Sequence, residues 1–327
     1  MGQAMSAAAT VRRRVAPRPW VGAVVVPAGQ STHPGFEGAT DGRDGPHAEV
    51  VALAAAGDAA KGSTLYVTLE PCSHHGRTPP CAEAIIAAGV AKVIIGVTDP
   101  DPKVSGAGIA LLREAGIEVS VGCCADLVSQ QLAPYLRHRS TGRPFVVLKL
   151  ASTLDGRIAA ADGTSQWITG DEARLDAHRL RADSDAVLAG AGTIRADDPA
   201  LTVRLPQDER HPDDTEPLRV VLGSVPAGAA VQPCLELSGD LGVILDDLGS
   251  RGVLQLMIEG GAMVAKAFHE AGLVDRYVLY VAPAFFGGDN AQGLFAGPGA
   301  NSINELWRGR IVDVARVGDD LRLEIED

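Results

Sequence analysis

The chain has 327 residues, of which 46% are hydrophobic, and its formal net charge at pH 7 is −12. This length suggests about two domains, and the composition is that of a globular α/β chain rather than a disordered one. The acidic balance argues against a dedicated nucleic-acid binder, and no apolar run approaches the ~18 residues of a membrane span.

The first half of the chain is predicted to alternate strands and helices. After a short first helix, the β-branched run from Trp20 to Val26 stops at Pro27 and predicts a strand. The stretch from Gln30 to Gly45 is rich in Gly, Asp and Thr and predicts an irregular strand or loop. Similar patterns predict strands at 65–69, 93–97 and 117–121 and helices at 47–60, 81–88 and 109–114. This alternation implies a sheet covered by helices.

A metal site is predicted at the ends of three of these elements. His47 and Glu49 begin one predicted helix, Cys72 follows a predicted strand, and Cys81 begins another helix. Hydrolytic zinc takes three protein ligands and keeps its fourth position for water. Zinc deaminases carry H-x-E followed by P-C-x-x-C, with the glutamate as general acid/base. Here the cysteines are nine positions apart, so the polar segment between them must loop back to the metal.

Two other interpretations of these residues stay open. The histidine could cap a helix while the two thiols are simply buried, as free cysteine often is. Alternatively, the zinc could be structural, with His74 or His75 as a fourth ligand. The chain has five cysteines, an odd count, and the remaining three have no partner pattern. A reducing, cytoplasmic compartment is therefore expected.

The second half is predicted to begin after a polar linker, Ser140 to Pro144, with the boundary near residue 142. Strands are predicted at 146–151, 187–190, 219–222, 254–258, 277–281 and 321–325, and helices at 171–182 and 262–271. Gly260 and Gly261 join a strand to a helix, where glycines let a phosphate approach backbone N–H groups. Such a turn is also common as a purely structural feature.

Several longer segments resemble the bifunctional deaminase–reductases of riboflavin biosynthesis. These segments are 65–81, 99–106, 148–157, 165–169, 196–204 and 258–261, and the resemblance extends from about Val21 to the C-terminus. It implies a cytidine-deaminase-like three-layer α/β/α domain over residues 1–142. It also implies a dihydrofolate-reductase-like α/β domain over residues 143–327 that uses NADPH.

The resemblance also implies roles for individual residues. Zn²⁺ would be held by His47, Cys72 and Cys81, with Glu49 as the catalytic acid/base. The implied cofactor-binding residues are Ala151, Trp167, Thr193, Asp197, Gly260 and Gly261. The implied substrate-binding residues are Ser165, Arg181, Leu201, Arg204 and Glu259. The two arginines suit a sugar phosphate, because guanidinium groups bind phosphate oxygens in bidentate fashion. Lys149 and Asp155 could form a further polar pair or be structural.

The implied substrate is a small molecule, 2,5-diamino-6-ribosylamino-4(3H)-pyrimidinone 5′-phosphate. It would lose an amine by hydrolysis, and its ribosyl group would then be reduced to ribityl by NADPH. A homo-oligomer is also implied. The chain departs from the family at Arg18, where an asparagine is usual, and in a shorter segment between Leu222 and Leu254.

Two alternative functions are weighed beside this one. The shortened segment favours a deaminase whose C-terminal half is only a scaffold. A nucleic-acid-editing deaminase would need basic grooves and stacking aromatic residues. The net charge of −12 and the 4% aromatic content disfavour that second alternative.

Overall fold

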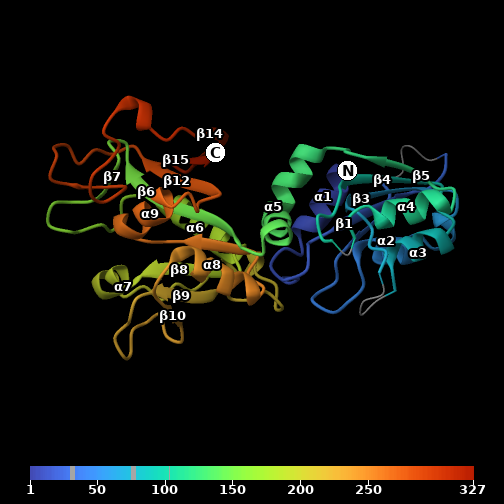
Figure 1. Ribbon diagram of the computed structural model, residues 1–327, viewed down its shortest axis with the longest axis horizontal. Coiled ribbons are helices and arrows are strands. Elements are labelled where there is room, and N and C mark those ends of the chain that lie inside the picture. The colour runs from blue at the N-terminus through green and yellow to red at the C-terminus, as the bar shows by residue number, and fades with distance from the viewer. Residues whose placement is uncertain (30–33, 75–78, 103) are drawn as a thin grey trace. The chain divides into compact units, whose positions relative to one another are not determined.

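The chain folds into two compact units, Met1–Arg143 and Pro144–Asp327 (Figure 1). They are seen in a computed structural model that describes residues 1–29, 34–74, 79–102 and 104–327. The last helix of the first unit, α5 (Ala125–Thr141), runs into the predicted linker and ends at Gly142, whose φ is +76°. The hydroxyls of Ser140 and Thr141 donate to carbonyls one turn earlier, so these two polar residues are helical and the linker prediction is wrong for them.

The N-terminal unit is built on a five-stranded sheet in the order β2-β1-β3-β4-β5. Its strands are β1 (Gly22–Val26), β2 (Phe36–Ala39), β3 (Thr64–Leu69), β4 (Lys92–Val97) and β5 (Glu118–Val121). β1 is antiparallel to β2 and β3, whereas β4 and β5 extend the sheet in parallel. The helices besides α5 are α1 (Gly2–Ala9), α2 (Ala48–Ala56), α3 (Cys81–Ala87) and α4 (Ala107–Glu114), with a 3₁₀ turn at Gly57–Ala60.

Glycines in the strands show that helices cover both faces of this sheet. A Cβ on Gly22 would lie 1.8 Å from the carbonyl oxygen of Ala4, so α1 packs directly on β1. A Cβ on Gly38 would lie 2.3 Å from the carbonyl oxygen of Ala48, so α2 packs on β2. Gly38 pairs with the neighbour of Gly22, and side chains alternate between faces along a strand. The two helices therefore lie on opposite faces, which is the three-layer arrangement predicted.

The C-terminal unit is built on an eight-stranded sheet in the order β10-β9-β8-β11-β6-β12-β15-β14. Its strands are β6 (Phe145–Thr153), β8 (Ala186–Gly190), β9 (Leu218–Leu222), β10 (Leu235–Leu237), β11 (Gln255–Ile258), β12 (Arg276–Ala282), β14 (Arg310–Val317) and β15 (Asp320–Glu326). The strands from β10 to β12 are parallel, and β15 and β14 are antiparallel. A short pair, β7 (Arg157–Ala159) and β13 (Gln292–Gly293), lies apart from this sheet.

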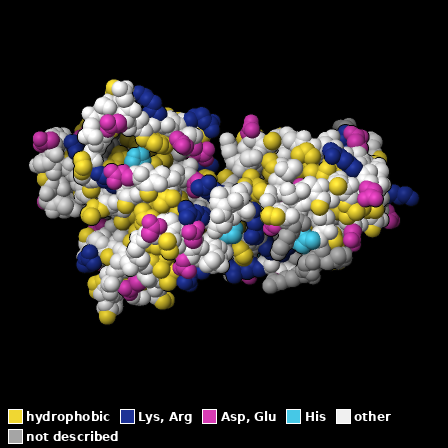
Figure 2. Space-filling view, viewed as in Figure 1, with side chains coloured by type: hydrophobic (Ala, Val, Ile, Leu, Met, Phe, Trp, Pro, Cys, Tyr) yellow, Lys and Arg dark blue, Asp and Glu magenta, His cyan; other side chains and the backbone are white. Residues whose placement is uncertain are grey.

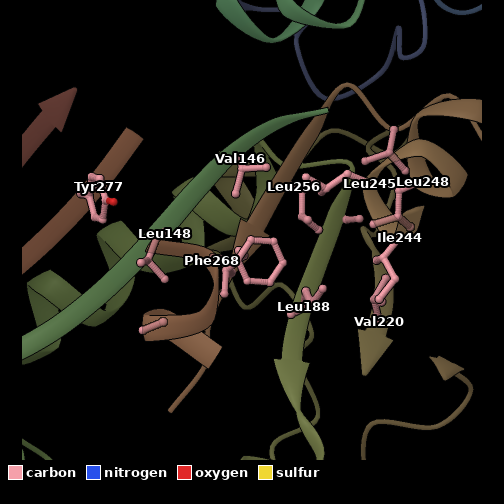
Figure 3. Close-up of a cluster of buried hydrophobic side chains, with 14 of the residues drawn as sticks. Val146, Leu148, Leu188, Val220, Ile244, Leu245, Leu248, Leu256, Phe268 and Tyr277 are labelled. Atoms are coloured by element: carbon pink, nitrogen blue, oxygen red, sulfur yellow. The ribbon is translucent and has the colours of Figure 1, made fainter. Parts of the chain in front are cut away.

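Hydrophobic side chains fill both faces of the larger sheet. Along β8 and β11, Leu188 and Leu256 belong to one buried cluster, and Val187 and Met257 belong to another. Figure 3 shows the first cluster, in which Phe268 lies among the leucines of the central strands. The helices of this unit are α6 (Asp171–Ala182), α7 (Ala191–Asp197), α8 (Leu241–Ser250) and α9 (Ala262–Glu270), with 3₁₀ turns at Gln207–Glu209 and Ile303–Glu305. A sheet buried on both sides explains the continuous apolar runs in its strands.

The shortened segment between Leu222 and Leu254 still contributes to the sheet. It forms the three-residue edge strand β10, which pairs with β9, and helix α8, whose leucines enter the core. The sequence did not predict the helices α5, α7 and α8 or the strands β7, β10, β13 and β14. In the described part of the chain, every helix is too short or too polar to cross a membrane.

Candidate active sites

Three side chains of the N-terminal unit converge as a metal site would require. His47 immediately precedes α2, Cys72 follows β3, and Cys81 is the first residue of α3. The Nδ1 atom of His47 lies 3.1 Å from the Sγ of Cys81 and 3.6 Å from the Sγ of Cys72. The backbone N–H of Cys81 donates to the Sγ of Cys72 at 3.3 Å, which joins the two cysteines directly.

The donor set fits zinc. All three ligand atoms lie within 4.8 Å of one another. Tetrahedral zinc, with Zn–S near 2.3 Å and Zn–N near 2.0 Å, brings its nitrogen and sulfur ligands to about 3.6 Å from each other. The two nitrogen–sulfur separations are 3.1 and 3.6 Å, so only a small adjustment at Cys81 is needed.

The protonation of the two thiols is linked. The hydrogen bond from Cys81 lowers the pKa of Cys72 to about 4, against the opposing effect of burial. The same hydrogen bond, together with burial, raises the pKa of Cys81. Because cysteine binds zinc as its thiolate, zinc binding is expected to release the proton of the Cys81 thiol.

Glu49 is placed beside this cluster as a proton carrier. It lies in the first turn of α2 and is only 3% exposed. Burial raises the pKa of Glu49 to about 7, although the positive charge of His47 opposes the shift. A carboxyl group that titrates near neutral pH can both take and return a proton during a reaction.

The alternative interpretations of the four residues find less support. His47 occupies the N-cap position of α2, but its side chain makes no capping hydrogen bond there. Among the described residues the cluster contains three ligands, and His74 is exposed. His75 lies outside the described residues.

Glu70 stabilises the segment that positions Cys72, a role that the sequence analysis missed. Its carboxylate is buried and accepts backbone N–H groups from Asp99 at 3.4 Å, Gly106 at 3.1 Å and Ile109 at 3.4 Å. The bonds from Gly106 and Ile109 satisfy N–H groups at the start of α4. A Cβ on Gly108 would lie 1.9 Å from the carbonyl oxygen of Pro71, so α4 packs against the residue preceding Cys72.

Arg18, the departure noted in the sequence, holds the segment that leads into His47. Its Nη1 donates to the carbonyl oxygens of Gly42 at 3.1 Å and Gly45 at 3.0 Å. Its charge is close enough to His47 to oppose protonation of the imidazole, although the hydrogen bond with Cys72 raises the pKa of His47 overall. The guanidinium thus fixes the backbone two residues before a metal-ligand candidate.

The C-terminal unit contains a cavity of about 770 Å³ at the carboxyl ends of its parallel strands. This edge is where open α/β sheets bind ligands. The backbone N–H of Gly261 donates to the Oγ1 of Thr193 at 3.2 Å, which joins the glycine turn to α7. Seven of the predicted residues line the cavity: Ala151, Ser165, Thr193, Asp197, Glu259, Gly260 and Gly261.

A charged cluster forms one wall of this cavity. Arg181 binds Glu259 through Nε at 2.6 Å and Nη2 at 2.9 Å, and its Nη1 donates to the carbonyl of Thr202 at 2.6 Å. Burial acts to raise the pKa of Glu259, but Arg181 outweighs it and the pKa is lowered. Burial lowers the pKa of Lys149, which also lines the cavity. Lys149 does not pair with Asp155, which instead accepts from Thr153 Oγ1 at 2.5 Å.

Four predicted residues lie outside the lining of the large cavity: Arg181, which is joined to it through Glu259, and Trp167, Leu201 and Arg204. Trp167 is 67% exposed and stacks with Arg174, beside Ser165 in a separate hollow of about 270 Å³. Leu201 is buried with φ at +52°, a strained conformation of the kind that clusters at functional sites. Arg204 is exposed.

His178 lies between the two arginines predicted to bind phosphate, and the sequence analysis missed it. Its Nδ1 is 3.0 Å from Nη1 of Arg181, and its Nε2 is 3.3 Å from Nε of Arg204. Burial, followed by the two guanidinium charges, lowers the pKa of His178 to about 4. The imidazole is therefore neutral at pH 7 and surrounded by donors. The only feature of the sequence that points to His178 is its place between two arginines on the helix of residues 171–182, in the pattern ARxDxHxLR.

Comparisons with known proteins match both units. Residues 1–97 match the family described as the cytidine and deoxycytidylate deaminase zinc-binding region, and residues 144–323 match the RibD C-terminal domain. The riboflavin biosynthesis protein RibD of Escherichia coli is 39% identical over 363 residues, covering 99% of this chain and 98% of that protein. RibD of Mycobacterium tuberculosis is 40% identical over 334 residues, covering 99% and 96%.

Solved structures agree with these matches. RibD of Acinetobacter baumannii superimposes with a TM-score of 0.91 at 38% identity, covering 99% of this chain and 97% of that one. A diaminohydroxyphosphoribosylaminopyrimidine deaminase/5-amino-6-(5-phosphoribosylamino)uracil reductase of Thermotoga maritima gives a TM-score of 0.86 at 34% identity, covering 100% and 97%. The predicted fold class of both halves is thereby confirmed.

Proposed function

The chain belongs to the family of the riboflavin biosynthesis protein RibD, and on that premise we propose how its own residues carry out the two reactions of that enzyme. It is a bifunctional enzyme of riboflavin biosynthesis, with a zinc-dependent deaminase domain followed by a reductase domain. The division of the chain at residue 142, the site residues and the reductant are the parts of this assignment that we infer.

In the deaminase domain, His47, Cys72 and Cys81 would hold the metal. When bound, zinc makes a water molecule acidic enough to supply hydroxide near pH 7. Glu49 would accept one proton of that water and pass it to the pyrimidine ring, and would then carry the second proton, from the newly added hydroxyl, to the departing amine. One C–N bond is then exchanged for a carbonyl, and ammonia leaves. The observation that supports this assignment is a buried carboxyl group with a pKa near 7 beside three converging ligand atoms.

In the reductase domain, the cavity at the carboxyl ends of the strands would hold NADPH and the ribosyl group together. When bound, NADPH supplies the hydride. The turn at Gly260 and Gly261 would receive the pyrophosphate, because α9 begins there and its first N–H groups lack helical partners. Glu259, held by Arg181, would face the substrate beside Lys149.

The phosphate of the substrate is assigned to Arg204, with His178 and Arg181 behind it. All three nitrogens of Arg181 already have protein partners, so this residue orients Glu259 and His178 more than it can bind a ligand directly. Arg204 is exposed and touches only His178 among the contacts given for it, so it is the one able to turn toward a phosphate.

The proposed substrate is the diaminopyrimidinone ribosylamino 5′-phosphate. A cytoplasmic location and a homo-oligomer remain predictions. The alternative in which the C-terminal half is only a scaffold is not favoured, because that half matches the RibD C-terminal domain and contains the cavity.

A coupled assay on zinc-loaded protein tests both assignments. Ammonia release and NADPH oxidation are followed separately with the proposed substrate. Both signals are expected from the wild-type chain. Ammonia without NADPH oxidation would contradict the reductase assignment, and neither signal would contradict the assignment of both sites.

A further inference from the structure

The cavity of the reductase domain is lined by two cationic side chains in the described part of the chain, Lys149 and Arg195. Lys149 is inside the charged wall, where the negative charge of Glu259 favours its protonation against burial. Arg195 is on α7 and is exposed. The two cations are therefore available to different parts of a ligand.

Arg195 has no protein partner among the described residues. Its guanidinium makes no hydrogen bond, ion pair or ring contact there. Asp197 is two positions further along the same helix, a spacing at which side chains do not face each other. The carboxylate of Asp198 is engaged elsewhere, because it accepts the backbone N–H of Ala230 at 2.8 Å.

Several other arginines of this domain bind carboxylates. Arg179 pairs with Glu209 at 2.6 Å, and Arg276 pairs with Glu326 at 2.6 Å. On the face drawn in Figure 2, acidic and basic side chains of the C-terminal unit are interspersed. An arginine that lines a cavity without a carboxylate partner therefore differs from these, and it leaves five N–H donors for a ligand.

Arg195 lies on α7, which forms one side of the proposed cofactor site. Thr193, two residues earlier, accepts the N–H of Gly261 in the turn assigned to the pyrophosphate. A Cβ on Gly223 would lie 3.0 Å from the Cβ of Ala191, so the turn after β9 lies against the start of α7. Ser224 of that turn lines the same cavity and offers a hydroxyl.

We propose that Arg195 binds the 2′-phosphate of the dinucleotide and so makes this reductase select NADPH over NADH. The proposal rests on the proposed function, in which the cavity holds the cofactor. NADPH and NADH differ only in that phosphate, and a nearby arginine is how other dinucleotide sites accept it. A guanidinium binds two phosphate oxygens at once. In a chain of net charge −12, a local cation is needed to attract this additional dianion.

Calorimetric titration of the full-length protein tests the proposal. NADP⁺, NAD⁺, 2′-AMP and 5′-AMP are each titrated into the wild type and into Arg195→Met, which keeps much of the aliphatic stem. The substitution is expected to weaken NADP⁺ and 2′-AMP by about 10- to 100-fold, the usual worth of a charged hydrogen bond. The affinities for NAD⁺ and 5′-AMP should change by less than about twofold, since they lack the phosphate.

Two further variants sharpen the result. Arg195→Lys keeps the charge without the bidentate geometry and should fall between the wild type and Arg195→Met. Arg308→Met is the matched control, because Arg308 is also exposed and does not line the cavity. It should leave all four affinities unchanged. The affinity of Arg195→Met for NADP⁺ should also change less with salt concentration than that of the wild type, because the variant lacks a charge contact that salt screens.

The possible failures are distinguishable. If the wild type binds NADP⁺ but Arg195→Met binds it equally well, or loses NADP⁺ and NAD⁺ by the same factor, Arg195 is not the selector and the cofactor site still stands. If the wild type binds neither dinucleotide, the cavity is not the cofactor site and the inference fails with it.

Discussion

The two proposed active sites of this enzyme differ in the kind of structure that forms them. In the deaminase domain, the side chains of His47, Cys72 and Cys81 meet within a few ångströms, and Glu49 is buried beside them. In the reductase domain, the cavity is lined largely by glycines, small side chains and strand ends. The first site depends on the chemistry of a few individual side chains, so a substitution that changes a single atom of one of them can abolish deamination. The second site depends on the order of the strands, so single substitutions in its lining should each reduce the reductase activity only partly.

Replacement of Glu49 by Gln should have the largest effect and would separate the two sites most clearly. An amide cannot accept the proton, so ammonia release should fall by about 10²- to 10⁴-fold. Reduction of the deaminated intermediate, supplied directly, should continue at the wild-type rate. The matched control is Glu83→Gln, an exposed first-turn glutamate on α3. Equal losses in both activities would mean that the sites are not independent.

Replacement of Glu259 by Gln tests whether the reductase site also depends on a particular pair of side chains, Glu259 and Arg181. The change leaves Arg181, whose side chain is only 9% exposed, without its carboxylate. Loss of one partner of a buried pair costs about 3–5 kcal/mol of unfolding free energy. Urea unfolding should show this loss in the C-terminal transition alone, with NADPH oxidation reduced and ammonia release unchanged.

The double variant Glu259→Gln/Arg181→Met is the control for that measurement. Because it removes the unpaired buried charge as well, much of the lost stability should return while reductase activity stays low. If the double variant is no more stable than Glu259→Gln, the charge pair is not what stabilises this wall.

The same contrast explains how much the sequence could predict. His47 and Cys81 were placed at helix starts correctly, because the helical composition of residues 47–60 and 81–88 begins at these two residues. In the reductase half, Lys149 and Ser224 were not assigned to a site, because only the parallel order of β6, β8, β9 and β11 brings them to one cavity. Helix α5 was missed because its polar last turn, stabilised by hydroxyl–carbonyl bonds, has the composition of a linker.

Gly108→Ala tests whether the deaminase site depends on packing as well as on its ligands. The new methyl group would meet the carbonyl oxygen of Pro71, a backbone atom that cannot simply rotate away. Overpacking of this kind costs about 1–3 kcal/mol. We expect the N-terminal transition to shift by that amount and zinc to be released at lower chelator concentrations. Gly2→Ala, at a glycine with open space, is the control. Unchanged zinc retention in Gly108→Ala would show that α4 does not support the Cys72 turn.

The smallest expected effect concerns His178, where the reductase domain uses a neutral side chain between two charges. Its pKa is lowered from 6.5 to about 4, so between those values the unfolded chain binds a proton that the folded chain does not. Stability of the C-terminal unit should therefore fall as pH decreases through that window. The side chain is only half-buried and solvent screens its neighbours, so the effect should be a modest one.

Comparison of thermal midpoints between pH 7 and pH 5 checks this sign. His178→Gln keeps a polar side chain that cannot take up a proton, so its midpoint should fall less than that of the wild type over the same range. The N-terminal transition provides an internal reference, because both proteins share it unchanged. A wild-type midpoint that rises toward pH 5, or an identical slope in the variant, would mean that His178 is protonated beside Arg181 and Arg204. The phosphate site would then carry three positive charges before any ligand arrives, and the arrangement of donors around a neutral imidazole would have to be abandoned.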